Sequence, residues 1–166
     1  MKNSYEIDLK KELGLSKENF RTQIIELEDR IKNIKGKGVI VGDSAICPLK
    51  HSFSDGIYVR EITIPAGMLI LGKIHKHDHP NFLLKGEVVV ITEEGGVEEL
   101  KAPCSMISKP GTKRALYAKT ELVWTTVHLN PTNTQDLEEL EEEIIAPNYK
   151  AYEKFLENTN KKQLKQ

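Results

Sequence analysis

Three of the five histidines of the chain lie at every second position in the segment KIHKHDHPNFLLKG, residues 73–86. Side chains of one parity share a face of a strand, so His75, His77 and His79 would converge on one spot if the backbone stayed extended. Neutral imidazole is a common ligand of divalent transition metals. The spacing therefore predicts a metal site.

The same triplet has a second interpretation that needs no metal. In this interpretation, His77 and Asp78 form the turn between two strands, while His75 and His79 form hydrogen bonds in the interior. His51, in the segment PLKHSFSDG, is interpreted as a loop residue rather than a ligand. Both interpretations of the triplet stay open at this point.

Length and composition limit the classes of protein to consider. The chain has 166 residues, a one-domain size, with 24 basic and 25 acidic residues. A net charge of −1 gives no electrostatic reason to expect duplex nucleic acid as a partner. No apolar run approaches the roughly 20 residues that span a bilayer, so no membrane partner is expected. Cys47 and Cys104 form no CxxC pair and MKNSYEIDLKKEL is charged throughout, which predicts a reduced, cytoplasmic protein.

The pattern of side chains divides the chain into three zones, which we predict as a helical segment at 1–38, a β-barrel at 39–130 and a helical extension at 131–166. In the first zone a helix is expected to start at Ser16, together with Asn19, and to end at the glycines at 36 and 38. Its apolar positions recur at spacings of four and three: Phe20, Ile24, Leu27, Ile31 and Ile34. This stripe is interpreted as packing on its own domain, with a partner helix as the alternative.

The middle zone consists of short β-branched or apolar runs separated by turn residues. The runs are GVIVG, IYVREITI, MLILGKI, NFLLKG, EVVVIT and ELVWTTVHL. The turns include Asp55-Gly56, Gly95-Gly96 and Pro110-Gly111. Because no helical segment separates the runs, they predict an antiparallel sandwich or barrel.

The last zone is predicted to hold two helices. The residues 132–134 can cap a first helix over DLEELEEE, and Pro147 ends it. A second helix, NYKAYEKFLEN, precedes a Lys- and Gln-rich tail that is expected to be disordered.

The middle zone, over residues 55–130, resembles the cupins, a superfamily of small double-stranded β-helix or jelly-roll proteins. The first cupin signature runs Gly, five residues, His-x-His, three or four residues, Glu, six residues, Gly. This chain matches the register with Gly67, Lys73, His75, His79 and Gly86. Lys73 stands in place of the first histidine, and His79 in place of the glutamate.

The second cupin signature ends in Pro-x-Gly-x-x-His, and SKPGTKRAL resembles it with Gly111 in place. Lys109 takes the proline position, and Arg114 takes the position of the fourth metal ligand. REITIPAG, PGTKR and VWTTVH also resemble segments of small uncharacterised cupin-like proteins of bacteria and phages, a group that implies no particular activity.

The resemblance implies a mainly β fold: a cupin-like double-stranded β-helix, or jelly-roll barrel, with an N-terminal helix and a C-terminal helical extension. Arginine stays protonated and cannot be a ligand, so the usual set of three histidines and one glutamate is absent. A metal site is still expected from His75 and His79, completed by His77 or by His128 on a late strand. The expected cofactor is a divalent metal: zinc, iron, manganese or nickel.

The predicted function is that of a metal-binding, cupin-like protein handling a small anionic molecule, which Lys73 and Arg114 would orient. Whether it is an enzyme stays open; metal-assisted oxygen or hydrolytic chemistry is the expected class if it is. The first alternative is a module that binds an anion, metabolite or nucleotide without metal. The second is a structural protein acting through oligomerisation, and a homo-oligomer is expected.

Overall fold

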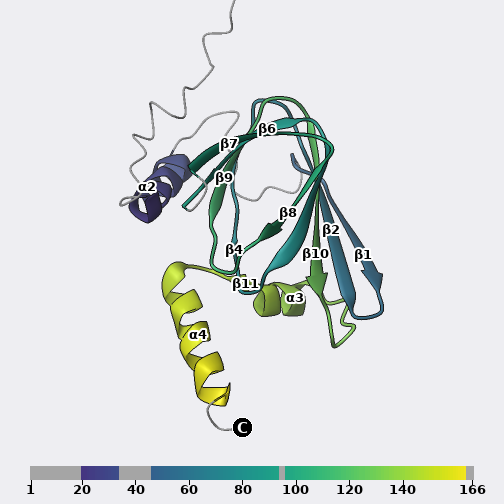
Figure 1. The fold of residues 1–166 in the computed structure, drawn as a ribbon, viewed down its shortest axis with the longest axis vertical. Coiled ribbons are helices and arrows are strands. Elements are labelled where there is room, and N and C mark those ends of the chain that lie inside the picture. Colours follow the sequence, from purple (N-terminus) through teal and green to yellow (C-terminus); the bar gives the residue numbers. More distant parts are fainter. Residues whose placement is uncertain (1–19, 34–45, 94–95, 164–166) are drawn as a thin grey trace, which may run out of the picture.

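The computed structural model describes residues 20–33, 46–93 and 96–163 of the chain. Two antiparallel sheets face each other, with helices at one side and at one end (Figure 1). The mainly β architecture predicted from the sequence is therefore confirmed. The strand predicted over GVIVG lies outside the described residues.

The larger sheet has five strands in the order β1-β2-β10-β5-β8. Their bounds are β1 Leu49–Ser54, β2 Ile57–Ile64, β10 Leu122–Leu129, β5 His79–Lys85 and β8 Cys104–Ser108. All neighbouring strands pair antiparallel. Strict alternation places His79, Asn81 and Leu83 of β5 on the buried inner face, so this strand carries polar groups into the interior.

The smaller sheet has four strands in the order β3-β9-β6-β7. Their bounds are β3 Leu69–Leu71, β9 Arg114–Ala118, β6 Glu87–Thr92 and β7 Gly96–Lys101. The main core lies between the sheets and includes Leu83, Leu122 and Trp124 from the larger sheet and Val88 and Val90 from the smaller one. Apolar packing thus fills one part of the barrel interior.

Helix α2, Phe20–Asn33, covers the outer face of the smaller sheet (Figure 1). Ile24, only 2% exposed, packs with Leu69, Leu71, Ile91 and Ala115. The expectation that this helix packs on its own domain is confirmed. The predicted helix ends, at Ser16 with Asn19 and at the glycines 36 and 38, lie outside the described residues.

The C-terminal extension closes one end of the barrel. Helix α3, Leu137–Ile144, packs Leu140 and Ile144 against Tyr58. Its N-cap is Asp136, whose side chain accepts hydrogen bonds from the next helical amides. The cap predicted at residues 132–134 was therefore wrong, because Asn133 lies in a left-handed turn at φ 54 instead.

Strand β11, Ile145–Ala146, follows α3 directly and pairs antiparallel with β4, Ile74–His75. Helix α4, Tyr149–Gln163, then extends away from the barrel (Figure 1). It includes residues 161–163, so the tail predicted to be disordered is helical where the structure describes it. Within the described residues, no helix combines the length and the apolar character needed to cross a membrane.

Candidate metal and anion site

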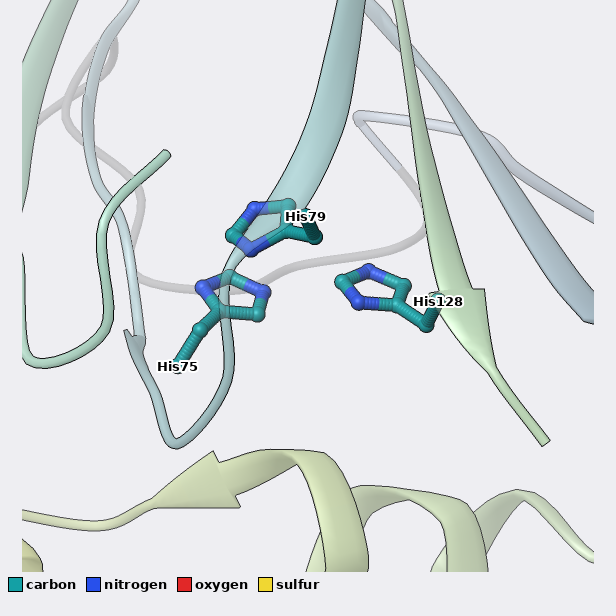
Figure 2. A group of neighbouring side chains, drawn as sticks. All are labelled: His75, His79 and His128. Atoms are coloured by element: carbon teal, nitrogen blue, oxygen red, sulfur yellow. The ribbon is translucent and has the colours of Figure 1, made fainter. Parts of the chain in front are cut away.

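Three histidines from three different strands converge at the end of the barrel that the C-terminal extension covers (Figure 2). They are His75 of β4, His79 of β5 and His128 of β10. One potential ligand atom from each lies within 4.8 Å of those of the others. The ring centroids of His75 and His79 are 4.1 Å apart, and those of His79 and His128 are 4.7 Å apart.

Strand pairing explains the convergence. β10 pairs with β5 so that Thr126 lies opposite Asn81, and His128 and His79 are the next inward positions toward the end of the barrel. His75 approaches from β4, where it pairs with Ile145 of β11. The C-terminal extension therefore holds the backbone of one of the three histidines.

Hydrogen bonds orient two of the rings. His79 Nδ1 lies 3.3 Å from the carbonyl oxygen of His77, so this nitrogen donates. His128 Nε2 lies 3.0 Å from Thr126 Oγ1, whose own proton is directed at the carbonyl oxygen of Arg60. His128 Nε2 is therefore also the donor. This leaves the lone pairs of His79 Nε2 and His128 Nδ1 to act as acceptors or ligands.

Burial keeps all three rings neutral. Desolvation, followed by the proximity of His79 and His128, lowers the pKa of His75 from 6.5 to about 2. Desolvation and the neighbouring His79 lower the pKa of His128 to about 3, and desolvation also lowers the pKa of His79. Neutral imidazole is the form that binds a metal, so the cluster is in a ligating state at neutral pH.

Two of the residues predicted for the site lie elsewhere. The backbone bends at Lys76 and His77 and does not stay extended, so His77 is exposed and its ring meets that of Phe155 edge-on at 5.5 Å. Lys73 is also exposed and forms a 2.5 Å ion pair with Glu141 of α3. Neither side chain joins the three clustered histidines.

Arg114 does enter the interior, from the first position of β9. Its Nη1 donates to Asn81 Oδ1 at 3.4 Å, and its Nη2 donates to Ser108 Oγ. Both acceptors are buried and neutral. Burial lowers the pKa of the Arg114 guanidinium, which is the expected cost of placing a cation among uncharged groups.

A second interior arginine, Arg60, was missed by the sequence analysis. It lies on β2 between Tyr58 and Ile62, which share its parity and contribute to the buried clusters. Desolvation lowers the pKa of Arg60. The available signal was the strand IYVREITI, where strict alternation places a cation between two apolar neighbours on one face.

His51 lies within strand β1 rather than in a loop, so its interpretation from the sequence was wrong. Its Nδ1 is 2.7 Å from the hydroxyl of Tyr58, and the two rings stack at 5.9 Å. The ring of Tyr58 in turn stacks on His128 at 5.9 Å. A row of rings therefore connects the histidine cluster to the outermost strand of the larger sheet.

Comparisons with known proteins relate the chain to others by structure alone. No family model matches the sequence, and no curated protein matches it. Among solved structures, ectoine synthase from P. lautus is similar over 64% of this chain and 79% of that one, with 18% identity and a TM-score of 0.50.

Two further similar structures are described as double-stranded β-helix proteins. An RmlC-like cupin family protein from Methanocaldococcus jannaschii is 14% identical over 52% of this chain and 83% of its own, with a TM-score of 0.44. A protein from Klebsiella pneumoniae is 18% identical over 56% and 84%, with a TM-score of 0.46. With its two facing antiparallel sheets, the chain has the double-stranded β-helix fold of the cupins, as the sequence resemblance predicted.

The donor set at the closed end of this barrel suits a divalent metal. Three neutral imidazoles, with two of the rings fixed by hydrogen bonds from their other nitrogen, are the arrangement found at zinc, iron and nickel centres. Arg114 takes the sequence position of the usual fourth ligand and supplies a positive charge instead. The site is therefore suited to a metal together with an anion.

Proposed function

We propose that this chain binds a divalent metal through His75, His79 and His128 and holds a small anionic molecule beside it. The observation that carries the proposal is the convergence of three imidazoles, two of them buried and that of His75 partly buried, with ligand atoms within 4.8 Å of one another. Three protein ligands leave coordination positions for water or a substrate. A metal bound there would supply a Lewis acid or an activated water.

The surrounding side chains have separate roles in this proposal. Thr126 and the carbonyl oxygen of His77 accept from the ring nitrogens and orient His128 and His79. Arg114, held by Asn81 and Ser108, attracts and orients the anion by charge-assisted hydrogen bonds. Helix α3 and strand β11 cover this end of the barrel and limit the access of water (Figure 2).

Elemental analysis of untagged protein tests the metal. The protein is treated with chelator, reconstituted separately with zinc, iron, manganese and nickel, and freed of excess ion. Wild type and the matched control His77→Ala should each retain about one metal ion per chain, whereas His75→Ala, His79→Ala and His128→Ala should retain none. Wild type without metal after all four reconstitutions, or undiminished metal in the three cluster variants, would contradict the proposal.

A second candidate function is anion binding without metal. The observation that favours it is the pair of interior arginines, neither of which forms an ion pair with a carboxylate in the part of the chain that the structure describes. Metal-free protein that is stabilised by an anion would support this candidate. The homo-oligomer and the structural function expected from the sequence stay predictions.

A further inference from the structure

The barrel interior carries two cations that no described carboxylate neutralises. Among the residues that the structure describes, the Arg114 side chain donates only to the neutral groups of Asn81 and Ser108. Arg60 has the charge of Glu141 in its surroundings, but within residues 20–33, 46–93 and 96–163 it forms no ion pair, and Glu141 itself pairs with Lys73. Both side chains are partly buried, and removing an uncompensated charge from water is costly, so these two arginines indicate a site built for an anionic ligand.

The two arginines are associated with opposite ends of a row of inward-facing side chains that runs beside the histidine cluster. Across the larger sheet, Arg60 of β2 is opposite Thr126 of β10, which is opposite Asn81 of β5. Two strand spacings of about 4.8 Å separate the backbones of Arg60 and Asn81 by roughly 10 Å. Arg114 binds at the far end of this row, at Asn81 and at Ser108 of the next strand.

The electrostatic environment of the histidines agrees with this placement. Arg60, but not Arg114, is among the charges that depress the pKa of His128. Arg114, but not Arg60, depresses the pKa of His79. Both arginines depress the pKa of His75, which faces the other two rings. Both guanidinium groups therefore act electrostatically on the histidine cluster.

We infer that the ligand of this site is a small dicarboxylate, with one carboxylate bound by Arg60 and the other by Arg114, so that it spans the three histidines. The inference rests on the anion-binding part of the proposed function and assigns a role to Arg60. Because the backbones of Arg60 and Asn81 are roughly 10 Å apart, a molecule with two separated carboxylates matches this row better than a single compact anion such as inorganic phosphate. Planar guanidinium groups bind carboxylates through paired hydrogen bonds, which favours two carboxylates over two unrelated anions.

Calorimetric titration and thermal unfolding test the inference with malonate, succinate and glutarate as dicarboxylates, and with propionate and inorganic phosphate as single anions. Wild type should bind the best dicarboxylate at least tenfold more tightly than propionate or phosphate. Arg60→Gln and Arg114→Gln should each bind that dicarboxylate no more tightly than propionate. Lys85→Gln, which removes an exposed cation that pairs with Glu121, should leave all affinities unchanged.

A readout without ligand separates a binding arginine from a structural one. Arg60→Met removes an uncompensated, partly buried charge, so it should raise the melting temperature of the ligand-free protein while it removes dicarboxylate selectivity. The inference would be overturned if wild type bound propionate or phosphate as tightly as the best dicarboxylate, or if Arg60→Met kept the selectivity of wild type.

Metal content, measured on the same samples, keeps the two proposals distinguishable. Stoichiometric metal without dicarboxylate selectivity leaves the metal site standing and overturns the inference. Dicarboxylate selectivity in protein that retains no metal after any of the four reconstitutions supports the inference and contradicts the metal site.

Discussion

Asn81 Oδ1 accepts a hydrogen bond from Trp124 Nε1 at 3.0 Å inside the barrel. The same oxygen accepts from Arg114, while Nδ2 of Asn81 donates to Ser108 Oγ and to the carbonyl oxygen of His79. With 1% of its surface exposed, Asn81 joins the apolar core around Trp124 to the polar end that contains the histidines. This single amide therefore contacts three residues of the candidate site: Arg114, Ser108 and His79.

Replacing this amide should destabilise the fold. Asn81→Ala leaves the indole N–H and the Arg114 guanidinium without a buried acceptor, and we expect a loss of roughly 2–4 kcal/mol in the free energy of unfolding. Urea denaturation measures the loss. Asn158→Ala, at an exposed position of α4, is the control and should change stability by less than about 0.5 kcal/mol. Equal stabilities of the two variants would show that the amide network contributes nothing.

The neutral histidine cluster predicts a dependence of stability on pH. Histidine in the unfolded chain titrates near 6.5, whereas the folded-state pKa values of His75 and His128 are about 2 and about 3. Between these values the unfolded state binds protons that the folded state does not, so stability falls as the pH falls below 6.5. Each such histidine lowers the free energy of unfolding by about 1.4 kcal/mol for each pH unit below this range's upper end.

Chelator-treated protein, unfolded in urea from pH 7 to pH 5, provides this measurement. The difference between wild type and His75→Gln isolates one histidine from the titrating carboxylates, and the variant should lose stability less steeply on acidification. His77→Gln, at the exposed histidine, should follow the wild-type curve. Parallel curves for all three proteins would contradict neutral burial of the cluster.

The fold was predictable because its signals are local. Alternating apolar strands, turn glycines and the spacing from Gly67 to Gly86 are each determined over a few residues, and together they define an antiparallel barrel. The ends of elements were less predictable: Asp136 is the N-cap of α3, whereas the sequence predicted a cap at residues 132–134. Pairing of β11 with β4 is a long-range contact without a local pattern.

The candidate site was only partly predictable, because it depends on contacts between distant strands. The two-residue spacing suggested that His77 would join His75 and His79, but the chain bends between β4 and β5 and turns it outward. His128 enters the cluster through the register of β10 against β5. Arg60 was missed because surface exposure is the usual state of a strand arginine; its parity with Tyr58 and Ile62 was the local signal, and its register with Thr126 agrees with it.

Two glycines with similar positive φ angles allow a test of how α4 attaches to the barrel. Gly111 has φ 77, and a Cβ there would lie 2.5 Å from Tyr152 Cε1 of α4. Gly56 has φ 70, and a Cβ there would meet no atom within 4 Å. Alanine at either position carries a similar backbone strain of about 1 kcal/mol.

Gly111→Ala should therefore cost roughly 1–3 kcal/mol more than Gly56→Ala, because it also displaces Tyr152. Thermal unfolding measures the difference, and hydrogen exchange should show reduced protection of the α4 amides in Gly111→Ala alone. The same loss of stability in both variants, with unchanged exchange in α4, would mean that Tyr152 does not anchor the helix.

The attachment of α2 depends on an ion pair that is unusual in its burial. Lys113 Nζ lies 2.5 Å from Glu28 Oε2, and these side chains are 9% and 21% exposed. Glu28→Gln leaves a buried ammonium without its counter-charge, so we expect a loss of about 3 kcal/mol in the free energy of unfolding.

The matched control is Glu121→Gln, which breaks the 2.7 Å ion pair with Lys85. In this pair the side chain of Glu121 is 53% exposed and that of Lys85 is 62% exposed. Solvent already screens these two charges, so this change should cost less than about 1 kcal/mol. Adding Lys113→Met to Glu28→Gln removes the unpaired ammonium and should recover most of the lost stability. Urea denaturation of the four proteins measures these effects; a Glu28→Gln loss no larger than that of Glu121→Gln would show that the buried pair does not hold α2 to the sheet.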